Sequence, residues 1–241
     1  MAIRESRPSV PRPTSRDPLK LGAISLIGDR LMPNSREVTD ELRQAAEGDN
    51  AAWQRVVGAH HARLRRMIVL RLDPRLSRRV DPDDILQDVY LDAAGQLIDY
   101  LVEPQVPFFL WLRLLTGHWI GRAHRHHLGT QSRNVNRDRS IDQSMPNASS
   151  LNLAAQLLGR EERPSEAAQR AERSEKIQAA LDDMDVIDRE VLSLRHFEQL
   201  SRVESAAVLG ISESAASKRY LRALARLKNL ILDDLKELGE L

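Results

Sequence analysis

The segment Leu200–Leu227 constrains the fold of this chain more than any other part of its sequence. Ser201 and Glu204 stand at the spacing of a capping box, which begins a helix by satisfying its first backbone N–H groups. Gly210 then supplies a turn, and Ser212 is placed to cap a second helix that runs without Gly or Pro through the end of the segment. Two helices joined by a short glycine turn form a helix-turn-helix.

The chain before this segment also has a helical period, in place of the two-residue alternation of strands. Asp81 is an expected helix N-cap because Pro82 follows it at the first helical position. Expected helices begin near 38 and run over 53–72, 81–101 and 108–128. We therefore predict an all-α fold.

Two segments of different composition divide the chain. Residues 1–36 are rich in Arg, Pro and Ser, which predicts a disordered arm. Residues 130–170 are mostly polar, with a short apolar patch at 151–158, and a stretch this long without structure is unusual inside one compact domain. We therefore expect a flexible linker between two small helical domains, 37–129 and 171–241, with the helix-turn-helix in the second.

Composition excludes several classes of protein. The 241 residues contain no Cys, which excludes disulfides, thiolate metal sites and cysteine nucleophiles, and fits a reducing compartment. No apolar run approaches the roughly 20 residues that span a bilayer, and the N-terminal residues lack the apolar core of a signal peptide. We expect a cytoplasmic protein without a membrane span.

The net charge of +1 conceals a strong segregation of charge along the chain. Residues 60–79 carry seven Arg and one Asp, whereas residues 81–103 carry seven acids and no base. Further basic blocks follow at 111–139 and 212–228. One such block is usually a solvated helix face, but several blocks on separate helices indicate surfaces for partners of opposite charge.

The second helix of the helix-turn-helix is expected to lie in the major groove of DNA, with its N-terminal residues at base edges. The residues that we assign to DNA contact are Ser212, Glu213, Ser214, Ser217, Lys218, Arg219 and Arg222. Among them, Arg219 and Arg222 lie better for phosphates than for bases. A plain helical hairpin is the alternative interpretation.

The predicted helix over 108–128 mixes aromatic rings with cations. The residues that we assign to DNA contact on this helix are Trp111, Arg113, His118, Trp119, Arg122 and Arg125. Unpaired bases stack on aromatic rings while Arg meets the phosphates, so this combination suits melted DNA. The alternative is that Trp111 and Trp119 are ordinary core residues.

His124, His126 and His127 raise the question of a metal site, and a metal-dependent hydrolase is a third, weaker hypothesis. Their spacing is not the i, i+4 pattern of a helical zinc site, and no acidic residue stands beside them. The chain has no glycine-rich phosphate loop followed by Lys and no recognisable nucleophile with its base. We therefore predict no catalytic residue, no metal and no cofactor.

Three motifs in this order resemble the sigma-70 family of bacterial RNA polymerase sigma factors, in the extracytoplasmic-function type. The stretch Asp81–Ala93 resembles the acidic helix with which that family docks on the clamp helices of the largest polymerase subunit. Phe108–Leu112 is similar to the opening of the promoter-melting helix, and Leu209–Arg219 to the reader of the minus-thirty-five element. The resemblance covers about 37–129 and 171–235.

This resemblance implies a non-enzymatic initiation factor that binds core RNA polymerase and promoter DNA, both double-stranded and melted. Residues 37–129 would contact polymerase and the minus-ten element, and residues 171–241 the minus-thirty-five element. The expected polymerase-binding residues are Asp81, Asp84, Gln87 and Asp88, of which the last three share one helix face. An anti-sigma factor is a further expected partner. The alternative is a helix-turn-helix regulator that does not bind core polymerase.

Overall fold

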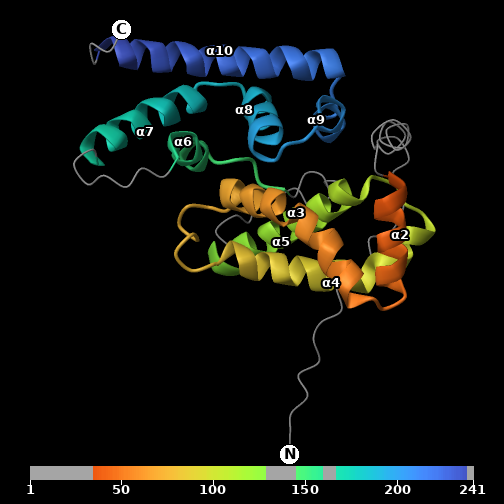
Figure 1. Ribbon diagram of the computed structural model, residues 1–241. Coiled ribbons are helices and arrows are strands. Elements are labelled where there is room, and N and C mark those ends of the chain that lie inside the picture. Colours follow the sequence, from red (N-terminus) through yellow and green to blue (C-terminus); the bar gives the residue numbers. More distant parts are fainter. Residues whose placement is uncertain (1–34, 129–144, 160–166, 238–241) are drawn as a thin grey trace, which may run out of the picture.

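The computed structural model describes residues 35–128, 145–159 and 167–237, and in these ranges the chain is helical and contains no strand. The helices form two layers, with the N-terminal helices in one and the C-terminal helices in the other (Figure 1). The expected all-α fold is confirmed. The arm expected over 1–36 lies outside the described residues except for its last two positions. No helix in the described ranges has both the length and the apolar character needed to cross a membrane.

The N-terminal body is built from four helices: α2 (Ser35–Ala46), α3 (Asn50–Arg71), α4 (Pro82–Val102) and α5 (Phe108–Leu128). Their apolar faces meet in one core in which Leu64, Ile68, Val89, Leu112 and Ile120 are fully buried. Burial of each such side chain contributes about 1.5–3 kcal/mol. This core aligns α4 and α5, which carry most of the functional residues expected in the N-terminal half.

Local capping explains where these helices begin. The Asp49 carboxylate accepts hydrogen bonds from the backbone N–H groups of Ala51 and Ala52, and the Asp81 carboxylate accepts one from Asp83. Before α5, the Tyr100 hydroxyl donates to the carbonyl of Val106 at 2.9 Å and closes the turn between the two helices. Caps of this kind contribute about 1 kcal/mol each and set the helix boundaries.

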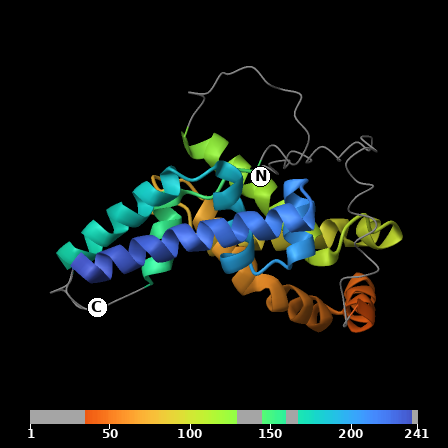
Figure 2. The same ribbon diagram turned by 90° about the horizontal axis from the view of Figure 1, so that it is seen from above.

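The C-terminal body contains α6 (Ser150–Leu158), α7 (Ala167–Asp182), α8 (Val186–Leu192), the π-helical turn η3 (Ser193–Phe197), α9 (Arg202–Leu209) and α10 (Glu213–Glu237). Its core includes Leu153, Leu181 and Leu192, none of which is exposed. Seen from above, α10 runs the length of this layer (Figure 2).

The structure differs from the expected flexible linker over 130–170 at two places. Residues 167–170 already belong to α7, and residues 150–158 form the packed helix α6. Leu153 and Ala154 of α6 are fully buried, and the Asn152 side-chain amide donates to the carbonyls of Val69 and Leu72 at the end of α3. The apolar patch was visible in the sequence, but its burial depends on residues about 80 positions away, which no local pattern reveals.

The helix-turn-helix forms as its sequence predicts. Ser201 and Glu204 complete the reciprocal capping box of α9, and Gly210 ends this helix in the left-handed conformation at φ +63°. Ser212 then accepts a hydrogen bond from the Ala215 N–H at the start of α10. A left-handed residue at the end of a helix favours glycine because a side chain there meets the following carbonyl.

The two layers also share their cores. Leu194 and Leu200 of the C-terminal body pack into the core of the N-terminal body, while Leu70 of α3 packs into the core of the C-terminal one. The N–H of Ser149 donates to the carbonyl of Leu70 at 2.9 Å. The two bodies are therefore joined by direct packing in addition to the chain between them.

Candidate nucleic-acid interface

The acidic residues of α4 form an exposed face near its N-terminus. Asp84, Gln87 and Asp88 are exposed, and no ion pair within the described ranges involves either aspartate. Asp83 differs, because its carboxylate binds the Arg65 guanidinium at 3.0 Å, and Asp81 is the helix cap. The face at Asp84, Gln87 and Asp88 is thus an uncompensated negative patch next to the positive end of the helix dipole.

The same face of α4 becomes apolar toward its C-terminus. Leu91, Ile98 and Val102 are 62%, 64% and 80% exposed, and they follow Asp88 at helical steps of three, seven and four residues. Although Ile98 is apolar, it does not belong to the buried stripe of this helix, because its neighbour Leu97 is 3% exposed and takes the core position. Exposed apolar side chains in a row mark a surface for a partner. Their spacing from Asp88 was the signal that could have found them.

The aromatic residues of α5 are held against α4. The Trp111 ring stacks on Tyr100 with centroids 4.6 Å apart, and the Trp119 indole N–H donates to the Asp92 carboxylate at 3.2 Å. The Arg122 guanidinium lies over the Trp119 ring at 4.7 Å. Both tryptophans are half-buried, so each has one packed side and one side toward solvent.

The cations of α5 do not all lie on one surface. His118, Arg122 and Arg125 are exposed and form a basic face beside Trp119. Arg113, assigned to DNA contact from the sequence, is only 3% exposed, and its Nε donates to the Glu198 carboxylate at 2.8 Å. In this conformation Arg113 is therefore not available to DNA, because an acidic residue of the other body covers it.

The histidine group at the end of α5 has a structural contact. His124 Nε2 accepts a hydrogen bond from the backbone N–H of Asp73 at 2.9 Å, and burial lowers the pKa of His124. The rings of His126 and His127 contact each other edge to face. In the described ranges, no group of three or more His, Asp or Glu side chains is arranged to hold a metal ion.

The start of α10 presents the residues expected to contact base edges. Ser214 and Lys218 are exposed and Ser217 is partly exposed, while Ser212 is occupied as the helix cap. Glu213 lies 3.9 Å from the Arg202 guanidinium, so α9 and α10 are also linked by charge. The exposed Leu221 lies between Lys218 and Arg222 along the same surface.

Farther along α10, arginines form ion pairs with the helices beneath it. The Arg219 guanidinium binds Asp188 at 2.6 Å, and Arg222 lies 3.3 Å from the same carboxylate. Arg226 binds Asp183 at 3.2 Å. These pairs orient the helix, and since 64% of the Arg222 side chain stays exposed it can still reach a phosphate.

The two DNA-contact surfaces expected from the sequence are not adjacent. Helix α10 lies on the outer side of the C-terminal layer, and α8 and α9 stand between it and the N-terminal layer that holds α5 (Figure 1). The structure therefore presents the exposed start of α10 and the aromatic, basic helix α5 as separate surfaces, and an acidic and apolar face on α4 as a third.

Three comparisons relate the chain to known proteins. Residues 174–227 match the family "Sigma-70, region 4". The chain is 29% identical over 191 residues to the RNA polymerase sigma factor CnrH of Cupriavidus metallidurans, a match that covers 78% of this chain and 91% of CnrH. A solved structure of CnrH in complex with the cytosolic domain of CnrY has 24% identity and a TM-score of 0.47, covering 81% of this chain and 97% of that one.

The region 4 match falls on the helix-turn-helix body, and the similarity to CnrH extends over nearly all of that sigma factor, so it includes the N-terminal body. The motifs on α4, α5 and α10 stand in the order of the family. Both comparisons support the sigma-70 family of RNA polymerase sigma factors, in its extracytoplasmic-function type, as the family of this chain.

Proposed function

We infer that this chain directs promoter-specific initiation of transcription as a sigma factor, in the cytoplasm and without catalysis of its own. The observation that carries this inference is the combination of a capped helix-turn-helix in a region 4 body with a separate N-terminal body that exposes an acidic and apolar face. A protein that only binds DNA needs the helix-turn-helix but not the second body with its acidic and apolar face.

The residue assignments within this function are proposals. Asp84, Gln87 and Asp88 would contact core polymerase, with Leu91 and Ile98 continuing the docking surface along α4. This division gives the surface a charged edge that steers association and an apolar part that loses water on binding.

Two helices would contact promoter DNA. The exposed side of Trp119, with Arg122 and Arg125, would capture the melted strand of the minus-ten element by stacking and phosphate contact. Ser214 and Lys218 at the start of α10 would read base edges of the minus-thirty-five element in the major groove.

A protein partner of the anti-sigma kind is a further proposal. It is supported by the similarity to CnrH, a sigma factor for which a complex with the cytosolic domain of CnrY has been solved.

Run-off transcription with core RNA polymerase on a promoter library tests the function. The wild-type chain should start transcripts at defined promoters, and the double variant Asp84→Lys, Asp88→Lys should lose roughly tenfold in core affinity, about 1.4 kcal/mol. Glu47→Lys, a reversal of another exposed acid in the N-terminal body, is the matched control and should retain core binding. Promoter binding without any association with core polymerase would instead show a helix-turn-helix regulator.

A further inference from the structure

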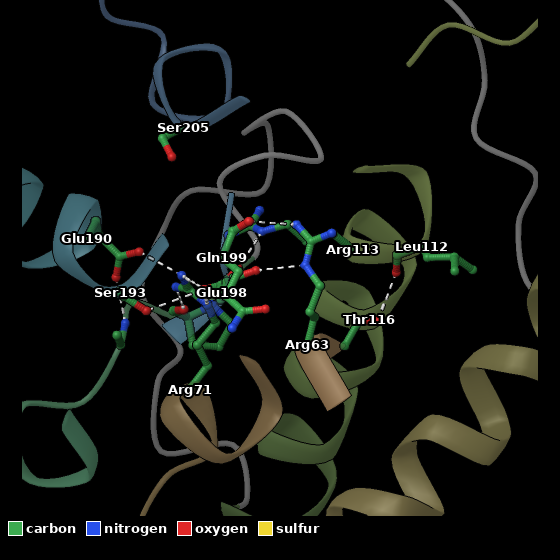
Figure 3. Close-up of polar contacts among 12 residues, drawn as sticks. Arg63, Arg71, Leu112, Arg113, Thr116, Glu190, Ser193, Glu198, Gln199 and Ser205 are labelled. Carbon is green, nitrogen blue, oxygen red and sulfur yellow. Dashed lines mark hydrogen bonds and ion pairs between the residues drawn. The ribbon is translucent and has the colours of Figure 1, made fainter. Parts of the chain in front are cut away.

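The arginines of the basic block 60–79 have different surroundings in the structure. Two of them bind the C-terminal body: Arg63 Nε donates to the Glu198 carbonyl at 3.0 Å, and Arg71 Nη2 donates to the Glu198 carboxylate at 2.7 Å (Figure 3). Arg65 is paired with an acid of α4. The exposed arginines without such a role stand on the loop between α3 and α4.

This loop, residues 72–81, presents three exposed arginines. Arg75 is held by the Asp73 carboxylate, which accepts hydrogen bonds from its Nε at 2.9 Å and from its Nη2 at 2.8 Å. These bonds from Arg75 lower the pKa of Asp73 to about 2, so the pair carries no net charge at neutral pH. Arg78 and Arg79 are also exposed, and among the residues that the structure describes neither forms an ion pair. The loop therefore exposes two uncompensated positive charges.

The loop is anchored to the core and to α5. The Leu76 side chain is buried in the core of the N-terminal body, and the Leu76 carbonyl accepts hydrogen bonds from the N–H groups of Arg79 and Val80 at 2.8 and 2.9 Å. At the other end of the loop, the N–H of Asp73 donates to His124 of α5 at 2.9 Å. The arginines thus project from an anchored backbone, so that binding a partner costs little loop entropy.

The bond between Asp73 and His124 joins the loop to the basic end of α5. Arg122 and Arg125 are exposed on this part of α5, after Trp119. Neither the loop nor the part of α5 after Trp119 contains Trp, Tyr or Phe. This surface offers no such ring to an unpaired base, whereas its guanidinium groups bind phosphates. The surface beyond Trp119 therefore fits the backbone of double-stranded DNA, and the ring itself fits the melted strand.

The promoter offers such a duplex beside the melted strand. Under the proposed function, α10 binds an upstream element that stays paired, so the DNA between this element and the melted strand is double-stranded. The loop also marks the point where the charge of the surface changes sign, because Arg79 is followed on α4 by the acidic face at Asp84. A polyanion such as DNA is attracted to the basic side of this point and repelled from the acidic side.

We propose that Arg78 and Arg79 bind phosphates of the promoter duplex that borders the melted strand. This proposal rests on the function proposed above and adds a duplex contact that the helix-turn-helix does not provide. Phosphate contacts are independent of base sequence, so the loop contributes affinity and fixes the position of the N-terminal body on the DNA.

Fork-junction DNA from a promoter found by run-off transcription tests this contact. One probe joins the single-stranded minus-ten element to an upstream duplex that stops before the minus-thirty-five element, and a second probe lacks the duplex. Bound to core polymerase, Arg78→Gln, Arg79→Gln should bind the fork more weakly than the wild type, with a salt slope smaller by about two ions. The ratio of wild-type to variant affinity should therefore fall roughly tenfold between about 50 and 200 mM salt. On the second probe the two proteins should bind alike.

Two further variants separate a local contact from a general loss of charge. Arg43→Gln, Arg55→Gln removes two exposed arginines, one in α2 and one near the start of α3, far from the loop that follows the end of α3. This control should keep the wild-type salt slope. Arg78→Lys, Arg79→Lys keeps both charges and should retain most of the affinity, because a lysine also binds phosphate as a point charge. Circular dichroism melts verify that each variant is folded.

Cross-linking identifies what lies against the loop. Because the chain has no Cys, Arg78→Cys introduces a single site for a benzophenone label. In the complex of polymerase and fork, the label should attach to the duplex part of the DNA. Attachment to a polymerase subunit instead would show that the loop binds protein, which overturns the proposal.

The outcomes separate this proposal from the proposed function. An unchanged salt slope in folded Arg78→Gln, Arg79→Gln, or an equal loss of affinity on both probes, overturns the duplex contact and leaves the sigma activity of the wild type intact. A wild-type chain that neither binds core polymerase nor initiates overturns the proposed function, and this proposal with it.

Discussion

Lys218 and Arg219 are neighbours on α10, yet their surroundings differ. Lys218 is exposed near the start of the helix, whereas Arg219 is held by Asp188 at 2.6 Å and Asp185 at 3.3 Å. The contact expected of Arg219 with DNA therefore competes with two carboxylates. Arg222 shares Asp188 at 3.3 Å but remains mostly exposed, so it is the better candidate for a phosphate.

We predict that the single-residue changes Lys218→Ala and Arg222→Ala have different effects on DNA binding. Loss of a base contact should change the preference among upstream promoter sequences by about 1–3 kcal/mol. Loss of a phosphate contact should weaken binding to all duplexes alike and reduce the salt slope by about one ion. Titrations of sequence variants at several salt concentrations measure both, with Lys228→Ala as an exposed control on the same helix. Equal proportional losses on every duplex would refute this division.

Helix α4 has a buried face and an exposed face of different composition. Its inner face supplies Ile85, Val89, Ala93 and Leu97 to the core, and its outer face exposes acids followed by apolar residues. Adjacent residues in a helix differ by about 100° in direction, so Leu97 and Ile98 experience different surroundings although both are apolar.

We predict that serine substitutions at these two positions separate folding from binding. Leu97→Ser should lower the free energy of unfolding by about 2–4 kcal/mol, because it removes a buried side chain and leaves a cavity. Ile98→Ser should change it by no more than about 0.5 kcal/mol and instead weaken core polymerase binding. Urea unfolding and a polymerase pull-down measure the two effects. Normal polymerase binding by Ile98→Ser would remove the apolar part of α4 from the docking surface.

For the whole molecule, the packing of α6 predicts where the native chain resists proteolysis. Thermolysin should not cut within 145–159, because Leu153 is buried and Asn152 is bonded to the end of α3. Leu153→Ser should abolish this protection. Mapping the first fragments by mass spectrometry tests the prediction, and an initial cut inside 145–159 in the wild type would show that α6 does not stay packed.

The dependence of stability on pH is a second property of the whole molecule. Burial, followed by the charge of Arg63, lowers the pKa of His60 from 6.5 to about 4, and the pKa of Glu198 is lowered to about 2. Both groups bind more protons when unfolded, so their stabilising contributions are complete above about pH 6.5 and decline as the pH falls.

We therefore expect the free energy of unfolding to be level above pH 6.5 and to fall by up to about 3 kcal/mol toward pH 4 on account of His60. Urea titrations at pH 7.5, 5.5 and 4.5 measure this decline. His60→Leu, which cannot be protonated, should flatten the curve in that range. A wild-type stability that rises on acidification would contradict the assigned direction.

The sequence by itself determined the local structure. The caps at Asp81 and Ser201, the left-handed Gly210 and the bounds of α5 all follow from interactions within a few residues, and each matches its expected place. The motif order on α4, α5 and α10 was equally readable, because each motif lies within one helix. These local features indicate the family without any information on how the two bodies pack.

Only the tertiary structure decided which charges remain exposed. Arg113 and Arg122 look alike in sequence, but Glu198 covers the first from 85 positions away, while the second lies in solvent beside Trp119. Likewise, Ile98 faces outward and α6 is packed because of helices distant in sequence. Burial of a charge depends on what the rest of the fold brings to it, and no local period contains that information.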